Sequence, residues 1–294
     1  MKKASIFVIV FLVLLSGCTK KAGQHNKAPK KVPMRIVSLA PSITEGLFML
    51  GVGSRIVGVT VYCQRPEEAK TKTKIGTILK PDIEKIVSLK PDIVFATQEG
   101  NRKEIIEKIQ SAGLNVFTFG KDESLNDIWD NFLLLGKIVG KQEKAVQILT
   151  DMDKRMAAVQ ARIECESSVT AFCELASEPL ITAAKGSFVD ELITMAGAVN
   201  IAHDEDVRYP NYSIEQVVMM DPDVIIIADM NRQMDKRINS ALNKWSVFVQ
   251  MKAVARNRIF LVDPYIICSP NPVALTEGFE EIAKMIHPKA FEEK

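Results

Sequence analysis

From residue 34 onward, short apolar runs alternate with stretches whose apolar residues recur at helical spacing. In the first half, strands are predicted at 35–39, 56–60, 93–96 and 116–119, with helices at 42–50, 82–89 and 102–111 between them. In the second half, strands are predicted at 169–174, 180–182, 224–228 and 259–262, and helices at 188–196, 213–219 and 273–286. Strands that alternate with helices predict an α/β fold with mostly parallel sheets.

A long helix separates the two halves. Residues 124–139 predict one helix that ends near Gly140, and residues 141–163 predict another that contains neither glycine nor proline. Its apolar residues share one stripe, which comprises Ala145, Ile148, Leu149, Met152, Met156, Val159 and Ile163. Because an average globular helix has only about 11 residues, we expect this one to join two lobes.

An internal repeat favours two similar lobes. Residues 83–95 (IEKIVSLKPDIVF) align without gaps on residues 214–226 (IEQVVMMDPDVII), with five identical positions. Each copy predicts a helix, a Pro-Asp corner and a buried strand, and the copies fall on either side of the long helix. A common helix–strand pattern can match by chance, but the shared Ile-Glu start and Pro-Asp corner favour a true repeat.

The first 17 residues have the pattern of a secretory signal peptide. Lys2 and Lys3 precede an unbroken apolar run from Ile6 to Leu15, which is shorter than the roughly 20 residues of a membrane span. The next residues complete the sequence LSGC, which resembles a bacterial lipobox whose cysteine, here Cys18, is lipidated. A short uncleaved anchor is the alternative, but the order and spacing of the parts favour a lipoprotein. We therefore predict a signal peptide at 1–17 and an extracytoplasmic protein anchored to a membrane through Cys18.

The formal net charge of +2 is the sum of two unlike parts. Residues 19–33 hold five lysines, two prolines and no acid, which predicts a flexible tether over 18–33. This tether is either a solvated spacer or a segment that lies on anionic lipid headgroups. Residues 34–294 hold 31 basic and 36 acidic side chains. Without clustered excess basic charge, we expect no nucleic-acid partner.

Motifs of the common enzyme classes are missing from the sequence. Gly51-Val52-Gly53 follows a helix and lacks the third glycine of a dinucleotide site, and neither a GxxxxGK loop nor a GxSxG motif occurs. His203 is followed directly by three acids, and consecutive residues rarely converge on one metal ion, so this run predicts a solvated loop. We predict no catalytic residue, metal site or cofactor, and keep an exported enzyme or a direct metal-ion carrier as alternatives.

Four cysteines besides Cys18 leave several roles open. Cys165 and Cys173 are either a disulfide pair, which an exported protein permits, or buried thiols. Cys63 and Cys268 each follow a predicted strand, one in each half of the chain. If their loops face each other across a cleft, the two thiols contact a bound metal complex or form a disulfide. Otherwise they are unrelated loop cysteines.

Several segments, taken in order, resemble the extracytoplasmic substrate-binding proteins of ABC importers for iron siderophores, haem and cobalamin. The matching pieces span about 34–288 and comprise RIVSLAPSITE (35–45), LGVG (50–53), IVGV (56–59), Tyr62-Cys63 with Pro66, both repeat copies and Ser269-Pro270. The resemblance implies two Rossmann-like lobes joined by a single long rigid helix, the class III periplasmic-binding-protein fold. The predicted N-terminal lobe is 34–140, the connecting helix 141–164 and the C-terminal lobe 165–294.

The resemblance implies a receptor rather than an enzyme. Such a receptor captures a metal chelate between its lobes and delivers it to a permease with a cytoplasmic ATPase, and we expect it to act as a monomer. Glu84 and Glu215, one in each lobe, match the family's acids that dock on permease arginines. Both are also first-turn acids that the helix dipole favours, and the two interpretations are compatible.

By position, loops at the carboxyl ends of strands are expected to line the ligand cleft. Tyr62 and Tyr209 are candidates to stack on a flat ligand, and Arg65 and Arg208 are candidates to pair with an anionic one. The other candidate ligand contacts are Ser42, Cys63, Thr77, Ile78, Ser187, Tyr265, Cys268 and Ser269. Cobalamin-binding members have tryptophans where this chain has Ile78 and Tyr209. The arginines and cysteines favour an anionic complex such as a ferric siderophore or haem, so these ligands and cobalamin stay open together.

Overall fold

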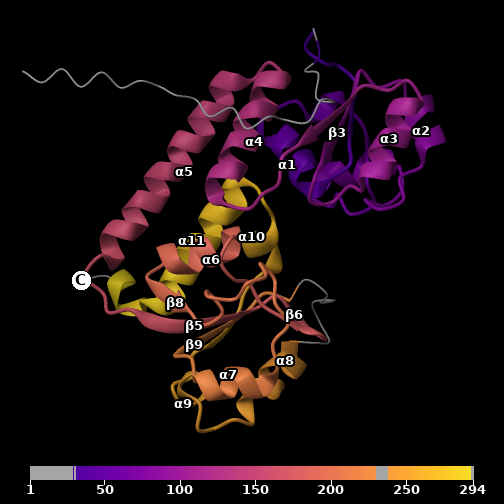
Figure 1. Ribbon diagram of the computed structural model, residues 1–294. Helices are drawn as coiled ribbons and strands as arrows, with labels where there is room; N and C mark the ends of the chain where they lie inside the picture. Colours follow the sequence, from indigo (N-terminus) through magenta and orange to yellow (C-terminus); the bar gives the residue numbers. More distant parts are fainter. Residues whose placement is uncertain (1–28, 30, 230–237, 293–294) are drawn as a thin grey trace, which may run out of the picture.

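Two α/β lobes, each built on a four-stranded parallel sheet, form the computed structural model, which describes residues 29, 31–229 and 238–292 (Figure 1). The first sheet has the order β2-β1-β3-β4, with β1 at Ile36–Ser38, β2 at Ile56–Val59, β3 at Ile93–Thr97 and β4 at Val116–Phe119. The second has the order β10-β9-β5-β8, with β5 at Val169–Glu174, β8 at Ala198–Asn200, β9 at Val224–Ile227 and β10 at Ile259–Leu261. The predicted α/β fold with two lobes and parallel sheets is confirmed.

Helices cover both faces of each sheet. On the first sheet, α1 (Pro41–Met49) and α4 (Leu125–Ile138) lie opposite α2 (Ile83–Ser88) and α3 (Lys103–Ser111). On the second, α6 (Phe188–Met195), α10 (Pro264–Cys268) and α11 (Pro272–Ile286) lie opposite α7 (Ile214–Met220), α8 (Ile238–Ser246) and α9 (Lys252–Ala255) (Figure 1). Each sheet face buries its own apolar cluster, so the two lobes have separate cores.

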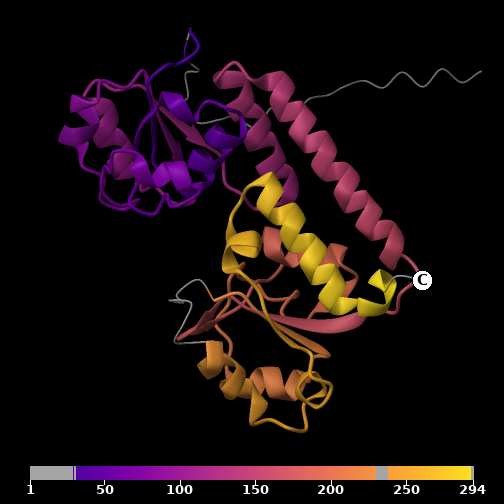
Figure 2. The ribbon, with the colours of Figure 1, turned by 180° about the vertical axis from the view of Figure 1, so that it is seen from behind.

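The long helix α5 (Gln142–Ile163) joins the lobes, as the sequence predicts (Figure 2). Ala145 and Leu149, near its start, pack in the core of the first lobe, whereas Met156 and Val159 pack in the core of the second. Helix α4 packs beside α5 and likewise contributes buried side chains to both cores. Because close-packed interiors deform little, this shared packing resists bending between the lobes.

The repeated Pro-Asp corner has the same structure in both lobes. Lys90 and Asp221, at equivalent repeat positions, follow α2 and α7 in the left-handed conformation, with φ of 45° and 46°. Asp92 Oδ2 then accepts 2.8 Å hydrogen bonds from two backbone N–H groups just before β1. The equivalent Asp223 Oδ2 accepts a 3.1 Å bond from a backbone N–H of β5. Each corner therefore fixes a neighbouring central strand, which supports the interpretation of the pattern as a true repeat.

The structure adds short elements that the periodicity does not predict. Residues 180–182, predicted as a strand, form β7 (Leu180–Ile181), which pairs antiparallel with β6 (Ala176–Ser177) outside the main sheet. Strand β8 and helices α8, α9 and α10 are new, as are 3-10 turns at Gly53–Arg55, Glu67–Thr71 and Pro288–Phe291. Most of these runs are too short to show a hydrophobic period, so the sequence pattern does not predict them.

The predicted signal peptide at 1–17, Cys18 and most of the tether lie outside the described residues. Within 31–229 and 238–292, no helix has both the length and the apolar character needed to span a membrane. The lipid anchor therefore stays a prediction.

Candidate ligand-binding cleft

The carboxyl ends of the strands direct their loops toward a cleft between the lobes. The cleft has a volume of about 740 Å³, which is within the range of roughly 300–1,000 Å³ for small-molecule sites. The first lobe contributes segments that follow β1, β2, β3 and β4, and the second contributes α10 and the loop before α11. The lining residues are Ala40, Pro41, Ser42, Glu45, Tyr62, Gln64, Arg65, Ile78, Thr97, Glu99, Gly100, Asp122, Pro264, Tyr265, Cys268, Ser269 and Pro270.

Both candidate arginines are already paired with acids of the opposite lobe. Arg65, in the first lobe, donates a 2.9 Å hydrogen bond to Asp263 in the second and lies 3.5 Å from the ring centre of Tyr265. Arg208, in the second lobe, donates a 2.9 Å bond to Glu99 in the first. The two ion pairs thus bridge the lobes in opposite senses. The two acids neutralise the positive charges of Arg65 and Arg208, which the sequence analysis expects to pair with an anionic ligand.

Glu45 is the centre of a third connection between the lobes. It lies on α1, is only 5% exposed, and lines the inner part of the cleft. Its Oε2 accepts 2.7 Å hydrogen bonds from the Tyr265 hydroxyl and the Asn271 side-chain amide, and a longer 3.5 Å bond from Ser269. Burial raises the pKa of Glu45 from 4.5 to about 7, against the opposing effect of these hydrogen bonds. This carboxyl group therefore titrates near neutral pH while it holds the two lobes together.

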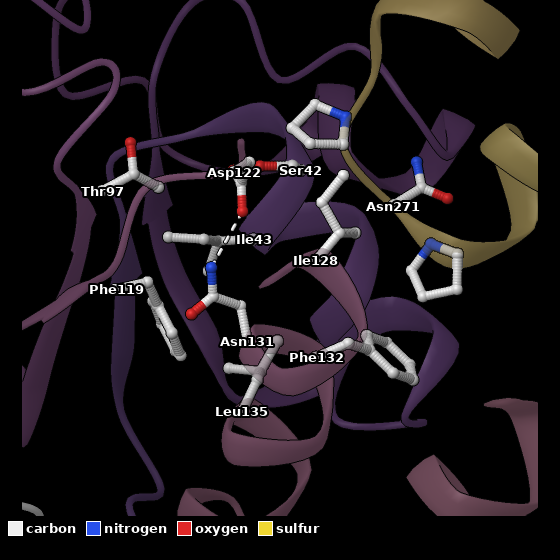
Figure 3. A pocket seen from close by; sticks show the side chains of 12 residues that line it. Ser42, Ile43, Thr97, Phe119, Asp122, Ile128, Asn131, Phe132, Leu135 and Asn271 are labelled. Carbon is white, nitrogen blue, oxygen red and sulfur yellow. Dashed lines mark hydrogen bonds between the residues drawn. The ribbon is translucent and has the colours of Figure 1, made fainter. Parts of the chain in front are cut away.

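Asp122 is a second buried acid at the same place. It follows β4, is 8% exposed, and lines both the cleft and an adjoining smaller cavity of about 30 Å³. Figure 3 shows this smaller cavity. The Asn131 amide, from α4, donates a 2.8 Å hydrogen bond to Asp122 Oδ1. Burial raises the pKa of Asp122 to about 6, and the negative charges of Glu99 and Asp127 add to the effect.

Most of the predicted ligand contacts lie in the wall of this cleft. They are Ser42, Tyr62, Arg65, Ile78, Tyr265, Cys268 and Ser269. Arg208 borders the cleft through its bond with the lining residue Glu99. Tyr209 lies beside Arg208, with 5.5 Å between the guanidinium carbon and the ring centre, and is not part of the lining. The predicted residues of both lobes thus line one cleft, and their contact with a ligand stays a prediction.

Three predicted contacts lie away from the cleft wall. Cys63 is completely buried, and its sulfur accepts a 3.1 Å hydrogen bond from the Thr44 hydroxyl. Thr77 closes a turn through its own backbone and hydroxyl groups. Ser187 is 2% exposed and caps α6 by accepting a 3.2 Å bond from the Asp190 backbone N–H. These three side chains have structural hydrogen-bonding roles instead.

The cysteine expectations also change. Cys63, Cys165, Cys173 and Cys268 are all free thiols, so neither possible disulfide forms. Because Cys63 is buried in the first core while Cys268 lines the cleft, the two sulfurs do not face each other across it. Burial raises the pKa of Cys268 to about 12, and a thiol held protonated is a poor metal ligand.

Sequence reasoning missed the acids that shape the cleft. Glu45 stands in the segment PSITE (41–45), where it is the single charged residue of a mostly apolar helix. That placement was a usable signal, because a lone acid on a mostly apolar helix needs a partner when it is buried. Glu99 and Asp122 lie in the loops after β3 and β4, at the edge where ligand loops are expected.

The two predicted docking acids lie outside the cleft, on different lobes. Glu84 is on α2 and Glu215 on α7, and both side chains are exposed in the first turn of their helices. Hydrogen bonds from its own backbone N–H and from the Ser213 side chain lower the pKa of Glu215. That carboxylate is therefore charged and accessible at neutral pH.

Two α/β lobes joined by long helices, with a solute-sized cleft between them, define the architecture of a bilobal binding protein. Residues 36–266 match the family described as periplasmic binding protein, and the chain belongs to this family.

Named relatives and solved structures agree with this assignment. The chain is 29% identical to YvrC of Bacillus subtilis, an uncharacterized ABC transporter substrate-binding lipoprotein, over 99% of each chain. It is 31% identical to the vitamin B12-binding protein of Vibrio cholerae, over 75% of this chain and 80% of that protein. The crystal structure of the vitamin B12-binding protein BtuF of Vibrio cholerae superposes with a TM-score of 0.75 and 26% identity, covering 89% of this chain and 99% of that one. A haem-binding protein of Pseudomonas aeruginosa, 24% identical over 89% of this chain and 95% of that one, shares the fold with a TM-score of 0.75.

Proposed function

We propose that this chain captures a corrinoid in the cleft between its lobes and delivers it to the permease of an ABC importer. A corrinoid is a flat cobalt chelate whose ring carries mostly uncharged amide arms. The chain is a substrate-binding protein by family, and its family consists of binding proteins rather than enzymes. The choice of ligand is our own inference, and it depends on the charges of the cleft.

The charge balance of the cleft is the observation that carries the proposal. Its lining holds three acids and one arginine, and that arginine, Arg65, is bonded to Asp263. Arg208 is likewise bonded to Glu99 at the border of the cleft. An anionic ligand, such as haem with its two propionates or a negatively charged ferric catecholate, would have to displace both acids from their arginines. A corrinoid with amide arms makes hydrogen bonds to the same acids without that cost.

Aromatic side chains and the relatives support the same ligand class. Tyr62 is 56% exposed at the cleft and is free to stack on a flat ring, although the chain has Ile78 where cobalamin-binding members have a tryptophan. The 31% identical vitamin B12-binding protein of Vibrio cholerae also argues for a corrinoid. The corrinoid is therefore favoured over the anionic chelates that the arginines and cysteines suggest from sequence alone.

Co-elution with coloured chelates tests this proposal. Purified protein is incubated separately with cyanocobalamin, haemin and a ferric hydroxamate siderophore, and free ligand is removed by gel filtration. We expect only cyanocobalamin to elute with the protein, at one equivalent, as read by visible absorbance. Co-elution of haemin or the siderophore in place of cyanocobalamin would overturn the choice of ligand. Absence of all three ligands from the protein fraction would contradict the proposal that this chain binds a metal chelate.

We also propose that the mature chain is a lipoprotein, held at the outer surface of a membrane through Cys18. The sequence pattern of 1–18 and the similarity to the lipoprotein YvrC support this. Replacing Cys18 with alanine is expected to move the protein from the membrane fraction to the soluble fraction, because the acyl chains supply the apolar surface that binds lipid. Immunoblots of the separated fractions measure this. Unchanged membrane association of the variant would show that something other than Cys18 anchors the chain.

The permease is the protein partner that we propose, contacted by a single copy of this chain. Its contact points would be Glu84 and Glu215, two exposed carboxylates on different lobes. Carboxylates on both lobes can form charge-assisted hydrogen bonds with two arginines at once, which fixes the orientation of the docked protein.

A further inference from the structure

We infer that Asp122, positioned by Asn131 at the inner end of the cleft, receives an N–H donor arm of the bound chelate and selects a primary amide over a carboxylate at that arm. This inference rests on the proposed function, which places a chelate in the cleft. It assigns a specificity-determining role to a residue that the sequence does not single out.

The geometry provides an acceptor that points toward ligand space. Asp122 lines both the 740 Å³ cleft and the 30 Å³ cavity, so this residue lies where the two spaces meet. Figure 3 shows its side chain among those that line the smaller cavity. Asn131 bonds to Oδ1 at 2.8 Å. Within the described residues this is the only hydrogen bond to the Asp122 side chain, which leaves Oδ2 available. A carboxylate that is 8% exposed and only half bonded is stabilised by any donor that a ligand brings.

The size and walls of the inner cavity restrict what can enter. Its volume of about 30 Å³ has space for one water-sized group, which is close to the end of an amide arm. Ile43, Phe119, Ile128, Phe132 and Leu135 form an apolar wall around it. A small group that donates hydrogen bonds to Asp122 fits this cavity, whereas a hydrated anion does not.

The charges around Asp122 also favour an amide arm of the ligand over a carboxylate arm. The charged groups that influence its pKa are Glu99, after β3, and Asp127, at the start of α4, and both are acids. Arg208, the cation closest to these acids among the ion pairs of the described residues, is already bonded to Glu99, so a carboxylate on the ligand would face negative charge. An amide arm instead donates its N–H to these acids. The same site therefore favours an amide arm of the ligand over a carboxylate arm.

Corrinoids offer a matched pair of ligands for this test. Mild hydrolysis of cyanocobalamin gives monocarboxylic derivatives, each with one amide arm converted to a carboxylate. At pH 7.5 we expect the wild-type chain to bind at least one of these derivatives roughly tenfold or more weakly than cyanocobalamin, which is the effect of about 1.4 kcal/mol. In Asp122→Asn the affinity for cyanocobalamin is expected to fall, and the discrimination against that derivative to shrink to within about threefold. Asp130→Asn, an exposed change on the same helix as Asn131, is the matched control and is expected to keep the wild-type preference.

A pH series with the wild-type chain tests the inference without any variant. Protonation of Asp122 removes its charge. The ratio between the affinities for cyanocobalamin and for the monocarboxylic derivative is therefore expected to decrease from pH 7.5 to pH 5.5, in line with the Asp122 pKa of about 6. Asp130→Asn is expected to show the same decrease. In Asp122→Asn only the smaller change contributed by Glu45, which lines the same cleft and has a pKa of about 7, is expected to remain. Equal discrimination by the wild type and Asp122→Asn at pH 7.5 would overturn the role of Asp122 alone. Binding of no corrinoid by the wild type would overturn the proposed function and this inference with it.

Discussion

A chain that carries both Glu84→Ala and Glu215→Ala is expected to bind its ligand as tightly as the wild type and to support almost no import. Both carboxylates are exposed and far from the cleft lining, so their removal leaves the ligand contacts intact. Each would form a charge-assisted hydrogen bond with the permease, worth about 1.5–3 kcal/mol. Losing two such bonds weakens docking by roughly 100-fold or more. Uptake of labelled cyanocobalamin by cells, compared with the affinity of the purified proteins, measures the two effects separately.

The matched control distinguishes docking from helix stabilisation. Glu104 on α3 and Glu143 on α5 are also exposed acids in the first turn of a helix, where they interact with the helix dipole in the same way. The double variant Glu104→Ala with Glu143→Ala is expected to import normally. Equal loss of uptake in both double variants would show that Glu84 and Glu215 only stabilise their helices. Loss of ligand affinity in the first variant would mean that these acids act on the cleft.

Replacing Glu45 with glutamine is expected to stabilise the chain at pH 8 and to leave it unchanged near pH 4.5. The pKa of Glu45 is about 7 when folded, against 4.5 for a free side chain. Between these values the folded chain binds more protons than the unfolded chain, so Glu45 makes the stability fall as pH rises. The full effect is at most about 3 kcal/mol, since one pKa unit corresponds to 1.36 kcal/mol. Glutamine keeps an oxygen that can accept from Tyr265 and Asn271 but has no charge to bury.

Urea unfolding of the two proteins from pH 4.5 to pH 8 measures this effect. The difference between their free energies of unfolding is expected to grow as pH rises, which isolates Glu45 from other titrating groups such as Asp122. Glu45→Ala serves as the contrasting variant. It removes the acceptor of two interlobe hydrogen bonds and is expected to lower stability by about 2 kcal/mol at pH 4.5. Parallel curves for the wild type and Glu45→Gln would contradict the buried, charge-bearing role of Glu45.

The elements that follow from local pattern were predictable, and the contacts that cross the lobes were not. Apolar periodicity located α5, and the repeated Pro-Asp pair located the corners before β3 and β9. Strand β8, with three residues after Gly197, is too short to carry a period. Its place at the sheet edge follows from tertiary pairing with β5.

In the site too, local sequence pattern predicted some residues, whereas those that depend on tertiary contacts were missed. Tyr62, Arg65 and Tyr265 were predicted because loops after strands converge at one edge of an α/β sheet. Cys63 was assigned wrongly to the cleft, because loop position alone does not reveal that its side chain turns into the core. Glu45 was missed because its partner Tyr265 lies 220 residues away in the chain. Only the packed structure brings such partners together.

The pairing of the arginines had the largest consequence for function. From sequence, Arg65 and Arg208 were free cations that favoured an anionic chelate. In the folded chain both donate hydrogen bonds to acids of the other lobe, at 2.9 Å each. Charge that is already neutralised does not select an anion, and this is why we propose that the remaining acids of the cleft, Glu45 and Asp122, favour a ligand that donates hydrogen bonds.

A calorimetric titration of cyanocobalamin tests most directly whether the cleft between the lobes is the corrinoid site. It is made on the wild type, on Gly100→Trp, which fills the cleft lining, and on Lys103→Trp, an exposed change on α3. A Cβ added at Gly100 would lie 3.2 Å from Ile78 Cγ2 and 3.4 Å from Thr97 Oγ1, so these side chains must shift by a few tenths of an ångström to accommodate the tryptophan. Gly100 lines the cleft, so the indole ring would occupy ligand space. We predict one site with micromolar or tighter affinity in the wild type and in Lys103→Trp, and a loss of at least tenfold in Gly100→Trp. No binding by the wild type, or equal affinity in all three proteins, would contradict the claim that a corrinoid binds in this cleft.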